Sequence, residues 1–82
     1  MKTIHKYMLV PFTSMPKGAE ILHIAKQDEF LRIWALVDPA NELEERKFRI
    51  LGTGWATAEE GLQHLATYQD GEYVWHVFEV IK

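Results

Sequence analysis

The sequence predicts a mainly β protein, in which five to six antiparallel strands form a curled sheet, a small barrel or a sandwich. Short runs of β-branched and aromatic residues recur along the 82 residues, and Gly, Pro and Asp residues separate them. Aromatic residues make up 12% of the chain, which favours a packed domain over disorder. The length suits a single domain, residues 1–82, and one short helix or helical turn is expected near residues 57–62.

The strongest strand candidate is Phe30–Asp38, an apolar run that Pro39 ends. Both sides of this run are apolar, since Trp34 and Leu36 lie on one side and Ile33 lies on the other. A run of this kind indicates a central strand that is buried on both faces.

The chain before this strand begins with another strand candidate. Thr3–Val10 alternates loosely and is rich in strand formers. Pro11 should end it, because proline has no N–H group to donate to a ladder. We interpret Phe12–Lys17 as a loop, and the motif Met15-Pro16-Lys17-Gly18 as a turn with proline and lysine at its centre.

Further strands are predicted on both sides of the central one. Ala19–Lys26 is expected to pair with it through a hairpin turn at residues 27–29, although a helix is also compatible with its composition. Pro39–Glu45 is an acidic connection, expected to be a solvated loop or a single helical turn. Arg46–Leu51 alternates cleanly between apolar and basic residues, as a half-buried strand does.

The C-terminal third contains the most ambiguous stretch. Thr57–Glu60 has the form of a capping box, which predicts a helical turn or a helix running to about Tyr68. A strand over Gln63–Gln69 is the favoured alternative, because Asp70-Gly71 is a hairpin turn signal and a hairpin needs a strand on each side. Glu72–Ile81 is the last strand and is apolar on both faces.

Charge and composition narrow the partners and the compartment. The net charge of −3 disfavours a general nucleic-acid binder, which usually carries a basic excess. No apolar run approaches the ~20 residues that span a bilayer, and the N-terminal stretch has no signal-peptide pattern. The chain has no cysteine, so disulfides are excluded. We expect a cytoplasmic protein without membrane contact.

The glycine-rich segment after Leu51 is the best candidate binding site. Its two glycines leave backbone amides accessible, and a helical turn behind them would present N–H groups to an anion. The competing interpretation is an ordinary turn with a bulge and a helix cap, since a Gly-x-Gly motif is weak by itself. The candidate ligand- or partner-binding residues are Gly52, Thr53, Gly54, Trp55, Thr57, Arg46 and Arg49.

The three tryptophans have different expected roles. Trp34 and Trp75 lie in apolar strands and are expected in the core. Trp55, in the glycine-bounded loop that follows the basic strand, is expected to be exposed and to act as an interface anchor or to stack on a base. An indole folded back over the barrel mouth is the alternative.

No catalytic, metal or cofactor site is visible in the sequence. The histidines are too scattered for a metal site: His5, His23, His64 and His76. Ser14 is the only serine and has no nucleophile motif around it. We therefore expect no metal, no cofactor and no enzymatic activity.

Several short motifs follow one another along the chain in an order that is also found in a known family: Lys2-Thr3-Ile4, Met15-Pro16-Lys17-Gly18-Ala19, Trp34-Ala35-Leu36-Val37-Asp38-Pro39, Phe48-Arg49-Ile50 with Gly52-Thr53-Gly54, and His76-Val77-Phe78-Glu79. Together they resemble a family of small proteins encoded largely by bacteriophages and prophages, known as a domain of unknown function. The resemblance covers nearly the whole chain. It implies phage or prophage origin and a strand before Asp70-Gly71, and it supplies no catalytic residues.

Three classes of function follow. The first is a small phage-type accessory protein that binds a host or phage protein stoichiometrically, with antagonism of a host defence system as a special case. The second is a binder of a small nucleotide-type ligand at the glycine segment and the basic strand. The third, an enzyme such as a hydrolase, ranks last. A homo-oligomer is compatible with all three, because a short β domain exposes strand edges.

Overall fold

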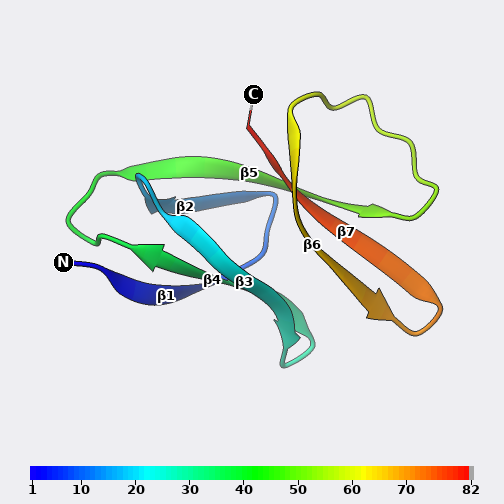
Figure 1. Cartoon of the computed structure of the whole chain (residues 1–82), viewed down its shortest axis with the longest axis horizontal. Helices are drawn as coiled ribbons and strands as arrows, with labels where there is room; N and C mark the ends of the chain where they lie inside the picture. The colour runs from blue at the N-terminus through cyan, green and yellow to red at the C-terminus, as the bar shows by residue number, and fades with distance from the viewer. Residues whose placement is uncertain (82) are drawn as a thin grey trace.

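The computed structural model describes residues 1–81 and has seven strands rather than the five or six predicted (Figure 1). They are β1 (Thr3–Met8), β2 (Phe12–Pro16), β3 (Glu20–Gln27), β4 (Phe30–Val37), β5 (Leu43–Gly52), β6 (Leu62–Asp70) and β7 (Tyr73–Val80). Every pairing is antiparallel. Residues 1–81 contain no helix, and therefore none that is able to cross a membrane.

The strands form two open sheets, so the prediction of a barrel is wrong. Sheet A has the order β1-β4-β3, and sheet B has the order β2-β5-β7-β6. The chain passes from one sheet to the other between β1 and β2, between β2 and β3, and between β4 and β5. Two of these passages contain Pro11 and Pro39, which lack the N–H needed to continue a ladder. The edge strands are β1 and β3 in sheet A and β2 and β6 in sheet B, so neither sheet closes on itself.

The core lies between the two sheets. Ile33, Ala35 and Val37 alternate along β4 and point toward sheet B, and all three are buried. Met15 and Phe48 oppose them from sheet B. The other members of the core are Leu9, Ala19 and Val77.

Only one face of the central strand is buried, so the prediction of two buried faces is wrong. Trp34 and Leu36 lie half-buried on the outer face of sheet A, and Phe30 is 54% exposed. Ile4 and Met8 of β1 lie on the same outer face by register and are also exposed. The sequence of β4 is apolar on both faces, but no third layer covers the outer one.

β2 is the strand that the sequence did not predict. Thr13 and Met15 are buried while Phe12 and Ser14 are exposed, which is the alternation of a strand with one buried face. Pro11 before this short strand and Pro16 at its end made the segment look like a loop. The turn after it is shifted by one residue from the prediction: Ala19 N–H donates to the Pro16 carbonyl (3.1 Å), which places Lys17 and Gly18 at its centre.

Both predicted hairpins are present, and their turns contain residues with positive φ angles. Asp28 and Glu29 join β3 to β4 with φ angles of 53° and 73°, as a type I′ turn requires. Gly71 joins β6 to β7 with φ 61°. Asp70 pairs with Tyr73, so the turn is centred on Gly71 and Glu72, one residue later than predicted.

The predicted helical turn near residues 57–62 is absent. Thr57 Oγ1 accepts a hydrogen bond from the Glu59 N–H (3.0 Å), but the segment has no helical hydrogen bonding. Gly61, with φ 69°, follows so closely that no more than one turn would form, and a single turn carries the whole cost of nucleation. The residues after it form β6, as the hairpin argument predicted.

Candidate functional site

The glycine segment forms a tight turn at the end of β5. Trp55 N–H donates to the Gly52 carbonyl (3.0 Å), and Gly54 has φ 89°, as the third position of a type II turn requires. Thr53 N–H donates to the Val74 carbonyl of β7 (3.2 Å) and so fastens the turn to the next strand. The turn therefore has a defined position on sheet B.

The turn holds Trp55 against Trp75 of β7. The two ring centroids lie 5.3 Å apart with an interplanar angle of 87°, an edge-to-face contact. The ring of Tyr73 stacks on Trp75 from the other direction, at 6.0 Å and 28°. We call these three residues the aromatic cluster. Trp55 and Tyr73 remain 60% and 67% exposed.

Gly52 is the residue that allows this packing. A Cβ atom at position 52 would lie 2.9 Å from two ring atoms of Trp55 and 3.2 Å from Trp75. No side chain fits there unless an indole moves. The glycine is needed at this position for close approach, whereas Gly54 is needed for its backbone conformation.

The aromatic cluster borders a hollow of about 210 Å³ at the end of sheet B. Its other walls come from the turn and from the start of β7, with Thr53, Glu72 and Val74 among the lining residues. Gly52, Thr53 and Trp55 are the residues of the predicted site that line it. Trp75, expected in the core, is half-buried and belongs to this hollow.

Arg49 lies on the outer face of sheet B and is paired with a carboxylate. Its Nε donates to Glu59 Oε1, and its guanidinium also lies 5.9 Å from the Phe12 ring centroid. Thr57 contributes indirectly, because its hydroxyl accepts the N–H of Glu59. Thr57 and Arg49 are thus brought together through Glu59, and neither lines the hollow beside Trp55.

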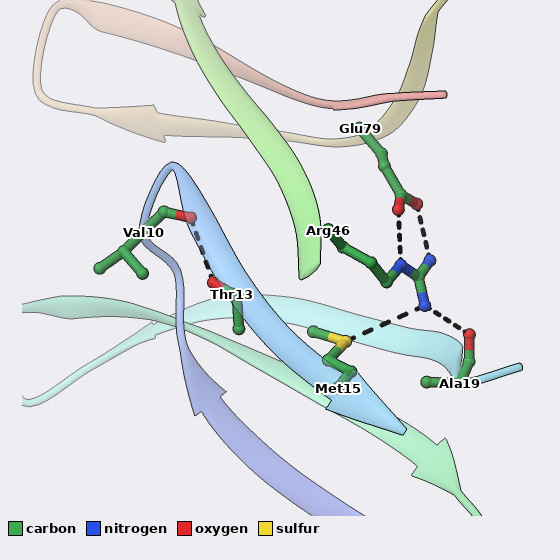
Figure 2. Close-up of polar contacts among 6 residues, drawn as sticks. All are labelled: Val10, Thr13, Met15, Ala19, Arg46 and Glu79. Atoms are coloured by element: carbon green, nitrogen blue, oxygen red, sulfur yellow. Dashed lines mark hydrogen bonds and ion pairs between the residues drawn. The ribbon is translucent and has the colours of Figure 1, made fainter. Parts of the chain in front are cut away.

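Arg46 lies apart from the turn, between the two sheets (Figure 2). Its Nε and Nη2 donate to the two carboxylate oxygens of Glu79 at 2.5 and 2.7 Å, and its Nη1 donates to the Ala19 carbonyl at 2.7 Å. The two side chains are 16% and 10% exposed. The hydrogen bond to Glu79 raises the pKa of Arg46, against the opposing effect of burial. Arg46 therefore connects the two sheets. The alternation along β5 could have predicted its inward position, because Arg46 and Phe48 are two residues apart and share a face.

With this geometry established, comparison with known proteins identifies the family. The profile of a family described as Domain of unknown function (DUF7352) matches residues 1–82. The chain belongs to DUF7352. No curated protein and no solved structure matches this DUF7352 chain. The family description gives no activity, so the function has to be argued from the site.

The DUF7352 chain also contains a hydrogen-bonded series that the sequence did not predict. Thr53 Oγ1 lies 2.8 Å from His76 Nε2, and Thr67 Oγ1 lies 3.1 Å from His76 Nδ1. His64 Nε2 lies 2.8 Å from the same Thr67 hydroxyl. The hairpin register pairs Thr67 with His76, so counting outward from the correct turn residues would have revealed the contact.

These histidines do not form a metal site in the DUF7352 structure. Among residues 1–81, no group of three or more His, Asp or Glu side chains is placed to hold a metal ion. The partners of His76 are the threonine hydroxyls of the series. The series therefore ties the turn of Thr53 to the β6–β7 hairpin, and through it fixes the position of the aromatic cluster.

Proposed function

We propose that this protein acts by stoichiometric binding of a protein partner, with the aromatic cluster as the centre of the contact. The observation that supports this is the position of Trp55, which is 60% exposed although the turn and the ring of Trp75 hold it in place. The indole fits there because Gly52 has no side chain. Tryptophan and tyrosine are enriched among the residues that dominate interface energies. A side chain that is already ordered loses less entropy on binding than a mobile one.

The charges of the site disfavour the alternative of a nucleotide-type ligand. Arg46 and Arg49, the cations proposed to hold its phosphate, are paired with Glu79 and Glu59. The helical turn that would have presented N–H groups is absent. The phage or prophage origin of the protein, a host or phage protein as its partner, and antagonism of a host defence stay predictions.

The experiment is isolation of the complex under native conditions from the cells that express the protein, followed by native mass spectrometry. The expected result is a complex of fixed stoichiometry with one protein. Trp55→Ala should weaken the measured Kd by at least ~30-fold, since a central interface residue contributes about 2 kcal/mol or more.

Trp34→Phe is the matched control, because Trp34 lies on the outer face of the other sheet. It should leave the Kd unchanged. A complex that forms equally well with Trp55→Ala and with Tyr73→Ala would overturn the proposal. If the isolated complex is a homo-oligomer whose interface covers the aromatic cluster, the partner is a second copy of the chain and not a foreign protein.

A further inference from the structure

We infer that the hollow beside the aromatic cluster accepts a cationic side chain, the ammonium of a lysine or the guanidinium of an arginine, presented by the protein partner. This inference rests on the proposed function and specifies the chemistry of its contact. It follows from the geometry of the rings, from the charge of the hollow, and from the way the rest of the molecule treats its exposed aromatic residues.

The ring geometry suits a cation. An aromatic face attracts a positive charge within about 6 Å of its centroid, and the indole of tryptophan does so most strongly. Trp55 and Trp75 are perpendicular, and Tyr73 is nearly parallel to Trp75, so the rings that border the hollow have two different orientations. A hollow of about 210 Å³ is large enough for the end of one long side chain rather than for a whole nucleotide.

The charge of the hollow is negative. Glu72 lines it, and no lysine or arginine does. Glu72 is exposed and has no hydrogen bond or ion pair with any residue among 1–81. Asp70, at the other end of the hairpin turn, is already paired with Lys26 at 3.9 Å. A phosphate would be repelled by Glu72, whereas an incoming cation would gain an ion pair and the aromatic faces together.

Other exposed aromatic rings of the molecule already have a cation of their own. Arg32 lies 5.6 Å from the centroid of Phe30, and Lys47 lies 5.8 Å from that of Phe12. These two phenylalanines are 54% and 51% exposed. Trp55 and Tyr73 are more exposed, and within residues 1–81 no lysine or arginine lies over either ring. The strongest cation-binding faces are left free for a group from outside the chain.

The test is titration of the full-length protein with a short peptide that contains one arginine, and with the same peptide in which neutral citrulline replaces it. The readout is the set of three indole N–H signals in a two-dimensional NMR spectrum, because the chain has three tryptophans. We expect saturable shifts at Trp55 and Trp75 and none at Trp34. The arginine peptide should bind about tenfold more tightly than the citrulline peptide.

Two variants test the two components of the site. Trp55→Leu should abolish the saturable shifts at Trp75, and Glu72→Gln should weaken arginine-peptide binding several-fold without changing citrulline-peptide binding. Glu20→Gln is the matched control, since Glu20 is an exposed carboxylate on sheet A. Glu72 lies at an exposed hairpin turn, so its substitution should leave the thermal melting curve unchanged.

The other outcomes are distinct. Equal binding of both peptides would overturn the inference and leave the proposed function standing, because the contact would be aromatic only. Choline binding that is tenfold tighter than that of the arginine peptide would also overturn it, in favour of a free quaternary ammonium ligand. In a third outcome, the arginine peptide binds saturably, but Trp55→Ala leaves the Kd of the natural complex unchanged. That result would refute the proposed function and leave the inference about the hollow standing.

Discussion

Gly52 determines the position of the candidate site without contributing any chemical group to it. Trp55 is exposed, so its burial alone does not fix it in place. The space above the Gly52 backbone is what allows the indole to lie beside Trp75. At the scale of single residues, the site depends on a side chain that is absent.

Gly52→Ala is therefore expected to impair binding more than folding. The added Cβ would lie 2.9 Å from Trp55, and the exposed indole can swing away at little cost. Partner affinity should fall as far as it does for Trp55→Ala. Gly18→Ala is the control, because its positive φ should cost about 1 kcal/mol of stability while it touches nothing near the cluster. Calorimetry and binding measurements on both variants separate the two effects.

The pair of Arg46 and Glu79 should behave as a buried ion pair. Glu79→Ala leaves a buried guanidinium without its carboxylate and should lower the free energy of unfolding by about 3 kcal/mol. The double variant Arg46→Met, Glu79→Leu should lose less than the single one, since no buried charge remains. Urea denaturation measures both. If the single variant is as stable as the wild type, the pair is not buried in solution.

At the scale of elements, the turn of the β3–β4 hairpin lowers the stability of the fold through its backbone conformation. Asp28 and Glu29 both adopt positive φ, a conformation that residues other than glycine and asparagine reach with difficulty. Asp28→Asn with Glu29→Gly should raise the free energy of unfolding by about 1 kcal/mol. Thermal denaturation of this double variant tests the prediction, and a drop in stability would contradict the turn type.

The elements also show where sequence reasoning succeeds and where it fails. The strand over Arg46–Leu51 was predicted, because burial of one face repeats every second residue, but β5 begins at Leu43, within the stretch predicted to be an acidic connection. β2 was missed because its only support is pairing with β5, a distant segment that local composition does not show. The capping box at Thr57 is a local preference for helix, and the pull of Glu59 toward Arg49 together with Gly61 overrides it.

For the candidate site, the sequence predicted the turn and the exposure of Trp55. It did not predict that Tyr73 and Trp75 would join Trp55, because that depends on how β7 pairs with β5. It also treated Arg46 as a ligand-binding cation, whereas Glu79 lies more than 30 residues away in sequence and only the folded chain brings them together. Long-range partners are what single-sequence reasoning lacks.

At the scale of the whole molecule, the protein is flat. Its Cα extents are 41 × 30 × 15 Å, and its radius of gyration of 13.2 Å exceeds the ~12 Å of a compact domain of this length. Its accessible area of 5585 Å² is about a tenth above the ~5,100 Å² expected for its mass. Two thin sheets leave much apolar surface outside the core.

Both sheets contribute a tyrosine whose titration should limit stability at alkaline pH. Burial raises the pKa of Tyr7 on β1 and of Tyr68 on β6 above the ordinary value of 10.0. A raised pKa in the folded state means that the associated stability is present below about pH 10 and is lost as the pH rises through the folded value. Urea denaturation from about pH 8 to about pH 11 should show this loss.

Tyr68→Phe should reduce the alkaline loss, since phenylalanine cannot ionise. Tyr73→Phe is the control, because Tyr73 is 67% exposed. If Tyr68→Phe loses as much unfolding free energy at alkaline pH as the wild type does, the folded state does not hold the pKa of Tyr68 above its ordinary value.

The series of hydroxyls and imidazoles behind Thr53 can run in either direction. With the protons in one order, His64 donates to Thr67, Thr67 donates to His76, and His76 donates to Thr53. With every proton reversed, these three contacts persist, but the Thr53 hydroxyl then donates to His76 and no longer to the Val74 carbonyl (3.3 Å). The backbone hydrogen bond from the Thr53 N–H to the Val74 carbonyl is the same in both orders, so the turn stays attached to β7 whichever tautomer each histidine adopts.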